Sequence, residues 1–329
     1  MDAHRFRRRE FTDADFPAFA EIWNRQVPMR PTTADRLREG RTMYEDPEGP
    51  GRYLAVEETS SGRLVAAALI VVPTWGAEPG TFFVDVLVDP DFERRGIGRS
   101  LAEALTDQGR AWGGRRLRAE VRGDVPRPLA FAQAQGFLER RRTWASIEEI
   151  DRVDLGSVPD RRAELAAAGI VLTTLAEEGP DRPEVRRAVF EAQRSASEDI
   201  PRTGGYRPPE FAAYVRSTFE TSTLTPASFF LARAGARYVG LSVLERIPAE
   251  PETLHLVYTG TVPEFRRRGI ATELKRRTVE YARAHGYRRI RTTNDSRNDR
   301  MWRINERLGY ARAWPFVHAE KPLDGPPAP

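Results

Sequence analysis

The sequence predicts an α/β (α+β) fold made of two tandem domains. One observation is the length of 329 residues, because a single domain typically holds about 100 to 200 residues. The other is an internal repeat, in which residues 85–98 resemble residues 258–271 at an offset of 173 positions. The same offset pairs Gly136 with Gly309, so the register runs without a gap from residue 85 to residue 136. A period this long indicates a duplicated domain and not a solenoid of short repeats.

Within each repeat, strand and helix patterns alternate in the same order. A run of β-forming residues is followed by a basic loop that contains glycine and then by a helix, whose apolar residues recur at helical spacing from Ile97 or Ile270. A short strand and a second helix follow, and Gly136 or Gly309 ends that helix. The strands expected in this part are residues 81–88, 116–121, 253–258 and 289–293.

Upstream of these segments, each repeat is expected to open with a strand and then a hairpin. The opening strands are residues 5–11 and 169–175, and the hairpins are residues 52–71 and 229–244, with glycine in each turn. The expected domains are residues 1–150 and 169–323, joined by a linker at 151–168 and followed by a disordered tail at 324–329.

The composition excludes several functional classes. The 48 acidic residues nearly balance the 52 basic ones, so no nucleic-acid or membrane partner is expected despite a net charge of +4. The absence of cysteine excludes thiolate metal sites and a cysteinyl acyl-enzyme, and it fits a reducing compartment. The four histidines are scattered, so no metal site is expected. No apolar run of about 18 residues occurs and no apolar stretch follows the charged N-terminus, so we expect a cytoplasmic protein.

The loop from Arg266 to Ala271 has the features of an anion-binding site. It leads from a strand into a helix, where backbone N–H groups lack partners and the helix dipole adds partial positive charge. A pyrophosphate satisfies both, and glycine lets it approach the backbone. The Walker pattern GxxxxGK[ST] is absent, and GxGxxG fails after Gly98. The pattern that fits is [QR]xxGx[GA], which Arg266, Gly269 and Ala271 match.

With its place after a strand and ahead of a helix, an Asn-rich turn and a Leu-Gly-Tyr sequence, this pattern resembles the coenzyme A loop of the GNAT N-acetyltransferases. The paired arrangement is similar to the tandem architecture of mycothiol synthase. The resemblance implies two GNAT-like domains, each a mixed, mostly antiparallel sheet flanked by helices. It also implies acetyl-CoA as the acyl donor, no metal, and direct transfer to an amine of a small molecule or peptide within a ternary complex.

The resemblance further implies which positions bind coenzyme A. The pantetheine arm would pair with the strand end from Tyr258 to Thr261, and the pyrophosphate would lie on the N–H groups of the loop. Asn298 would bond the pantetheine, or alternatively cap the following helix. The full set is Thr261, Val262, Arg266, Arg267, Arg268, Gly269, Ile270, Ala271, Asn294 and Asn298, with Gly96 and Gly98 in the first repeat.

A few residues near this loop are candidates for the chemistry. His255 occupies the strand position where some family members carry a catalytic glutamate, and its ordinary pKa of about 6.5 suits proton removal near neutral pH. The alternative is a histidine packed in the sheet. Asn305 stands where many members carry a tyrosine general acid, and an amide cannot supply a proton. Tyr258 or water would then protonate the leaving sulfur. Glu198 and Asp199 would hold a cationic amine, or alternatively end a helix.

The first repeat departs from this pattern at three positions. Glu93 replaces the first basic residue of the loop and would repel phosphate, while Phe82 and Ala132 occupy the places of the histidine and of the asparagine at the general-acid position. We therefore expect a degenerate, catalytically silent first domain that serves as a structural partner. Gly96 and Gly98 are retained, which leaves weak coenzyme A binding open.

Two other functional classes stay open. The missing tyrosine favours a regulatory protein that binds coenzyme A without turnover. Arginine clusters at residues 5–9, 140–142 and 266–268 suggest a nucleic-acid binder, which ranks last because aromatic residues make up only 9% of the chain and no helix-turn-helix pattern is present. A monomer and a homodimer are both compatible with the sequence.

Overall fold

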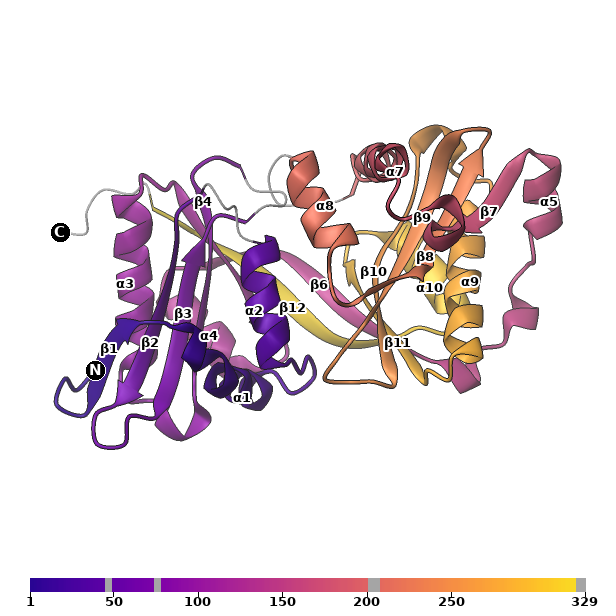
Figure 1. The fold of residues 1–329 in the computed structure, drawn as a ribbon. Coiled ribbons are helices and arrows are strands. Elements are labelled where there is room, and N and C mark those ends of the chain that lie inside the picture. The colour runs from indigo at the N-terminus through magenta and orange to yellow at the C-terminus, as the bar shows by residue number, and fades with distance from the viewer. Residues whose placement is uncertain (45–48, 74–77, 201–207, 324–329) are drawn as a thin grey trace. The chain divides into compact units, whose positions relative to one another are not determined.

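The computed structural model describes residues 1–44, 49–73, 78–200 and 208–323 (Figure 1). These residues group into two compact units. Unit 1 is built on residues 1–142 and 316–323, and unit 2 on residues 143–200 and 210–315. Each unit is a sheet flanked by helices, which confirms the predicted tandem α/β architecture. The tail at 324–329, predicted to be disordered, lies outside the described residues.

The sheet of unit 1 has the strand order β1–β2–β3–β4–β5–β12. Strands β4 and β5 run parallel, and the other neighbouring pairs are antiparallel. The strands are β1 (Phe6–Glu10), β2 (Gly51–Glu58), β3 (Leu64–Val71), β4 (Thr81–Val88), β5 (Arg116–Arg122) and the end of β12 (Ala311–Pro322). The helices are α1 (Phe16–Gln26), α2 (Ala34–Tyr44), α3 (Ile97–Ala111) and α4 (Pro126–Ala134).

The sheet of unit 2 repeats this plan in the order β6–β11–β10–β9–β8–β7. Here β10 and β11 are the parallel pair. The strands are the end of β6 (Leu138–Glu149), β7 (Ile170–Thr174), β8 (Leu224–Ala234), β9 (Arg237–Arg246), β10 (Thr253–Thr261) and β11 (Arg289–Asp295). The helices are α5 (Arg162–Ala167), α6 (Leu175–Glu178), α7 (Pro183–Ala196), α8 (Phe211–Phe219), α9 (Ile270–Ala284) and α10 (Asp299–Arg307).

Two amphipathic helices cover opposite faces of the unit 2 sheet. Helix α9 packs Ile270 and Leu274 into a core that includes Leu254 of β10. Helix α7 packs Val185 and Val189 against the other face, in a separate core. Each such buried aliphatic side chain contributes about 1.5–3 kcal/mol relative to an exposed one. Because both helices are anchored in this way, the loop at the start of α9 and the end of α7 are held against the tip of β10.

In both units the two parallel strands separate after a short ladder. Strand β4 pairs with β5 over Thr81–Phe83, and β10 pairs with β11 over Thr253–His255. Beyond His255, β11 stays paired with β6, whereas β10 has a bulge near Val257 and stays paired with β9. Within the described residues, the main chain of β10 from Val257 onward forms no ladder with β11. The fork leaves strand-edge N–H and C=O groups beside the candidate site.

The last strand of each repeat pairs inside the unit that holds the other repeat. The end of β6 pairs with β11, and the end of β12 pairs with β5. The registers are equivalent. Glu149 faces Arg289 in unit 2, and Pro322 faces Arg116 in unit 1. Glu149 and Pro322 are 173 positions apart in the chain, and so are Arg116 and Arg289. The sequence patterns predicted neither strand. The unit boundary therefore falls inside β6, after residue 142, and differs from the sequence-based boundary at residue 150.

The segment 151–168, expected to be a linker, packs into unit 2. Val153, Val158 and Leu165 are buried in the same core as helix α9. The backbone N–H of Arg161 donates a hydrogen bond to Glu273 at 3.2 Å. This segment is therefore part of the unit, and it lies close to the start of α9.

A pair of introduced cysteines is expected to report the exchanged strand. Ala145 faces Thr293 across β6 and β11, and such antiparallel partners have Cβ atoms about 4.5–5.5 Å apart. The double variant Ala145→Cys, Thr293→Cys should form an internal disulfide under mild oxidation, seen as a mobility shift on a non-reducing gel. The chain has no cysteine to compete. The control His318→Cys, Thr293→Cys uses the matching position of β12; a disulfide there instead would contradict the exchange.

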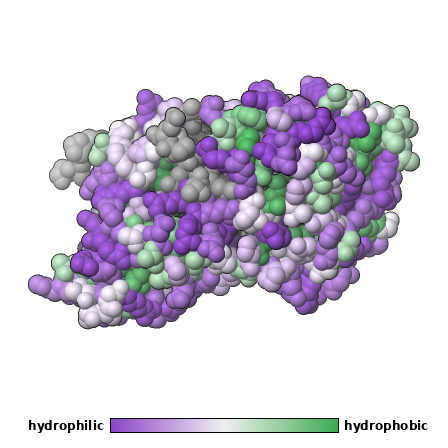
Figure 2. Space-filling model, in the orientation of Figure 1, coloured by the Kyte–Doolittle hydropathy of each residue, from purple (hydrophilic) through white to green (hydrophobic). Residues whose placement is uncertain are grey.

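The surface in Figure 2 is mainly hydrophilic, with hydrophobic residues in small separate groups. Among the described residues, no helix combines the length and the apolarity that crossing a membrane would require.

Candidate active site

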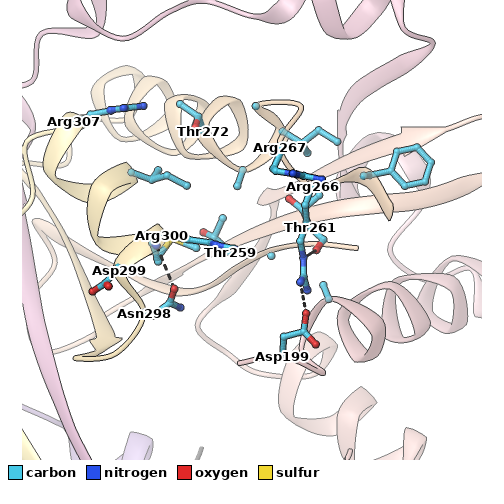
Figure 3. Close-up of a pocket in the computed structure, with 18 of the residues that line it drawn as sticks. Asp199, Thr259, Thr261, Arg266, Arg267, Thr272, Asn298, Asp299, Arg300 and Arg307 are labelled. Carbon is cyan, nitrogen blue, oxygen red and sulfur yellow. Dashed lines mark hydrogen bonds and ion pairs between the residues drawn. The ribbon is translucent and has the colours of Figure 1, made fainter. Parts of the chain in front are cut away.

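A pocket of about 680 Å³ lies within unit 2 at the tip of β10 (Figure 3). Its walls come from β10, the loop and first turn of α9, the start of α10, the end of α7 and the segment before α5. The structure thereby brings together segments from four parts of the sequence. Of the positions predicted from the sequence, those that line the pocket are Asp199, Thr261, Arg266, Arg267, Gly269, Ile270, Ala271 and Asn298.

The loop before α9 has the backbone of an anion cradle. Arg267 and Gly269 both have positive φ, at 64° and 85°, and alternation of this kind turns successive N–H groups inward. The left-handed φ of Gly269 favours glycine, and a Cβ there would also lie 2.4 Å from Cδ of Arg161, so that side chain would have to move. The free N–H groups of the first turn of α9 and the helix dipole add to the attraction for an anion.

Arg266 fixes the loop and does not simply face solvent. Its Nε donates to the carbonyl of Thr261 at 3.1 Å, and its Nη1 pairs with the carboxylate of Asp199 (Figure 3). Asp199 is thus paired with a loop arginine, while Glu198 is exposed and outside the lining. The first basic position of the sequence pattern therefore ties the end of α7 to the tip of β10.

Four further arginines line the pocket, and sequence reasoning did not assign them. They are Arg161, Arg297, Arg300 and Arg307. Arg297 donates to the carboxylate of Asp295 at 3.0 Å. Arg161 comes from the segment expected to be a linker, so no motif could have indicated it. The concentration of guanidinium groups favours a ligand with several negative charges.

The other positions predicted to bind coenzyme A have structural partners. Asn298 caps α10, accepting from the N–H of Met301 at 3.2 Å, and it also lines the pocket. Val262 is buried, and Arg268 lies over the ring of Phe265 at 5.0 Å. Both lie outside the described lining. Asn294 also lies outside it, with its side-chain NH₂ buried and without a hydrogen-bond partner among the described residues. The cap on Asn298 is compatible with both interpretations of that residue.

The candidate catalytic residues fall in two places. His255 is half-buried and is the last residue of β10 that pairs with β11, so it sits at the fork. Tyr258 follows the bulge, and its hydroxyl lies 2.9 Å from that of Ser197 at the end of α7. Asn305 is fully buried in α10 and lies outside the described lining. His255 and Tyr258 also lie outside the described lining.

The core on the α9 side of the unit 2 sheet also buries two ionisable side chains, which the sequence did not indicate. Glu148 of β6 and Lys275 of α9 are 0% and 2% exposed. Burial raises the pKa of Glu148 and lowers that of Lys275, and their mutual attraction opposes both shifts. The ammonium of Lys275 also lies 4.6 Å from the ring centre of Tyr310. The two partners stand 127 positions apart in the chain, so no local pattern could reveal them.

The corresponding loop of unit 1 keeps the backbone shape but has a carboxylate in place of the first arginine. Arg94 and Gly96 have φ values of 61° and 77°, as in the other loop. Glu93 accepts a hydrogen bond from Gln26 at 2.8 Å and pairs with Arg127. These contacts place a neutralised carboxylate where the second repeat has an arginine. Phe82 is buried.

No group of three or more potential ligands among the described residues is arranged to hold a metal ion.

Comparison with known proteins defines the class. The model of the Acetyltransferase (GNAT) family matches residues 16–137 and 190–310, which together make up most of the chain. This protein therefore belongs to the GNAT acetyltransferase family, as its repeat and loop indicated. A mycothiol acetyltransferase of Mycobacteroides abscessus is 26% identical over 296 residues, covering 88% of this chain and 92% of that relative.

Two further similarities concern parts of the chain or its fold. The [ribosomal protein bS18]-alanine N-acetyltransferase of Salmonella typhimurium is 38% identical over 88 residues, 27% of this chain, and the chain spans only 57% of that relative's length. A solved tandem GNAT protein from the clavulanic acid biosynthesis pathway matches with a TM-score of 0.76 at 21% identity, covering 98% of this chain and 100% of that chain. That likeness confirms the tandem GNAT fold.

Proposed function

We propose that this protein transfers an acetyl group from acetyl-CoA to an amine of a small molecule or peptide, at the site in unit 2. One observation carries the proposal: the pocket joins an anion cradle at Gly269 to residues 259–261 of β10, beyond the point where β10 leaves β11. A donor with a diphosphate at one end and an amide-containing arm at the other needs both features. Membership of the GNAT family supports the same assignment.

The residues present fit such a donor. Its diphosphate would lie on the N–H groups from Arg267 to Ala271, and lining arginines would neutralise the charge. The amides of the pantetheine arm would bond the edge of β10 from Val257 to Thr261, as an added strand does. Asn298 would contact the arm while it caps α10.

Bound acetyl-CoA would supply the acetyl group, held as a thioester whose carbonyl carbon the amine attacks. His255 at the fork takes the proton that the amine loses as the C–N bond forms. Tyr258 gives a proton to the sulfur as the C–S bond breaks, and Ser197 orients the phenol through the 2.9 Å contact. We give Asn305 no chemical step, because its amide is fully buried. With no cysteine in the chain, transfer is direct and not through a cysteinyl intermediate.

Unit 1 takes no part in the chemistry in this proposal. Glu93, held by Gln26 and Arg127, makes its loop unsuitable for a diphosphate. Phe82 stands where the base would be, and it is buried against Trp112 at 5.5 Å between ring centres. Unit 1 instead serves as a structural partner, with residues 316–322 of the second repeat as its last strand.

The test is acceptor-dependent thiol release by the purified full chain. Acetyl-CoA would be offered with amino acids, amino sugars and peptides with a free N-terminus, and product acetylation followed by mass spectrometry. Because the chain has no cysteine, every thiol detected comes from coenzyme A. Binding of acetyl-CoA without release for any amine would favour the regulatory alternative. Failure to bind acetyl-CoA would contradict both.

His255→Gln is expected to lower kcat by about 10²–10⁴-fold, the usual contribution of a general base. The KM for acetyl-CoA should hardly change, because His255 lies outside the described pocket lining. The matched control is His285→Gln, an exposed histidine just after α9. Steady-state kinetics with the best acceptor would check both. A His255→Gln enzyme with the kcat of the His285→Gln enzyme would contradict the role.

A further inference from the structure

His255 has a charged residue beside it on each neighbouring strand. Glu245 of β9 is its antiparallel partner, and Arg291 of β11 is its parallel partner. Directly opposed residues on one face have Cβ atoms about 4.5–5.5 Å apart. The flanking positions Leu254 and Leu256 belong to the core beneath α9, so His255 and its two neighbours face the opposite side of the sheet.

Glu245 is a buried carboxylate held in place by a short chain of hydroxyls. It is 8% exposed, and it accepts a hydrogen bond from Thr223 at 2.9 Å. The Thr223 hydroxyl is itself 2.8 Å from that of Thr221, and both threonines are buried. Burying a carboxylate is costly unless it is hydrogen-bonded and near a cation. Its position directly opposite an imidazole places a cation beside it whenever the imidazole is protonated.

Among the described residues, the other charges near His255 are engaged in pairs. Arg291 pairs with Glu250 at 2.8 Å. On α7, which packs against this face, Arg194 and Glu191 pair with one another at exposed positions. The buried pair beneath α9 lies on the far side of the sheet, since Glu148 faces Ile290 in register. Within the part of the chain that the structure describes, Glu245 is therefore the carboxylate best placed to act on the imidazole.

We propose that Glu245 is a positioning residue for His255, whose ring it orients and whose protonated form it stabilises during acyl transfer. The proposal rests on the function proposed above, and it adds Glu245 as the partner of the general base His255. A carboxylate paired with a histidine base acts in this way in hydrolases that use a Ser-His-Asp triad. The proton that leaves the amine goes to the imidazole and not to Glu245.

The variant Glu245→Gln keeps the shape and the hydrogen bond from Thr223 but removes the charge. We expect kcat to fall about 10-fold or more, since a base without its anion is weaker and less well oriented. The acid limb of kcat/KM should move to lower pH by about one unit, because loss of a nearby carboxylate lowers the pKa of the imidazole. The control Glu252→Gln removes a charge from an exposed pair with Arg288 and should change neither.

A direct titration separates this proposal from the proposed function. The chain has only four histidines, so the imidazole signal missing from His255→Gln identifies His255 by NMR in the full chain. Its titration in the wild type and in Glu245→Gln should differ in the same direction as the acid limb. If the wild-type protein shows no turnover, the proposed function is contradicted. The difference in the pKa of His255 measured by NMR still tests whether Glu245 acts on it. If the pKa of His255 differs by less than about 0.3 between the two proteins and kcat is also unchanged, the positioning role is overturned.

Two further variants test the same role if Glu245→Gln does not fold. Glu245→Asp keeps the charge and displaces it, so kcat should fall while the acid limb stays near its wild-type pH. Thr223→Val removes the hydroxyl that holds the carboxylate and should lower kcat in the same sense. Thermal melts would show that each variant is folded. Wild-type kcat in both folded variants would contradict the proposal.

Discussion

Gly269→Asp is expected to abolish acetyl-CoA binding and, with it, turnover. The aspartate would have to adopt a left-handed φ of 85°, and its Cβ would displace the side chain of Arg161, whose Cδ lies 2.4 Å away. Its carboxylate would also lie in the anion cradle, and like charges set against each other cost several kcal/mol, or about 100-fold or more in affinity. Calorimetric titration with coenzyme A and steady-state kinetics would measure the loss.

The control for this variant is built into the chain. Gly96 has the same place in unit 1 and a φ of 77°, so Gly96→Asp imposes a similar backbone cost without touching the proposed site. We expect it to bind and turn over like the wild type. If Gly96→Asp abolishes turnover in a folded protein, unit 1 is not silent.

Glu148→Lys is expected to destabilise unit 2 by about 3–5 kcal/mol, the cost of leaving a buried charge without its partner. Lys275 and the new lysine would face each other at positions that are 2% and 0% exposed. The midpoint of urea unfolding, followed by tryptophan fluorescence, would report the loss. Combining Glu148→Leu with Lys275→Met removes both charges and should be close to neutral or stabilising.

The adjacent residue provides a matched control for the charge reversal. Glu149 lies next to Glu148 on β6, is partly exposed, and pairs with Arg289 at 2.9 Å. Because exposed pairs contribute about 0–1 kcal/mol, Glu149→Lys should cost far less. Equal destabilisation by the two variants would show that the buried pair has no special role.

Much of the fold could be predicted because the relevant signals are local. The register from residue 85 to residue 136 established the duplication, and the alternation of strand and helix patterns around Ile97 and Ile270 established the class. The exchange of β6 and β12 could not be predicted. Both strands follow the same glycine turn and fit the same register on β5 or β11, so local patterning does not distinguish the two partners.

The candidate site was predicted where it depends on backbone chemistry and missed where it depends on long-range packing. The loop around Gly269 follows from the need for positive φ and for close approach to an anion. Arg161 could not be found, because only the packing of its segment into unit 2 brings it to the pocket. Glu245 was not assigned, since its relation to His255 depends on the pairing of β9 with β10.

The exchanged strands also mean that neither repeat alone contains all the strands of one sheet. A chain cut between residues 151 and 168 would give two fragments, each missing the strand that completes its sheet and each carrying a strand made for the other. Such fragments are suited to complement each other and poorly suited to fold alone. For the same reason, residues of the first repeat pack against residues of the second inside unit 2, as Glu149 and Arg289 do.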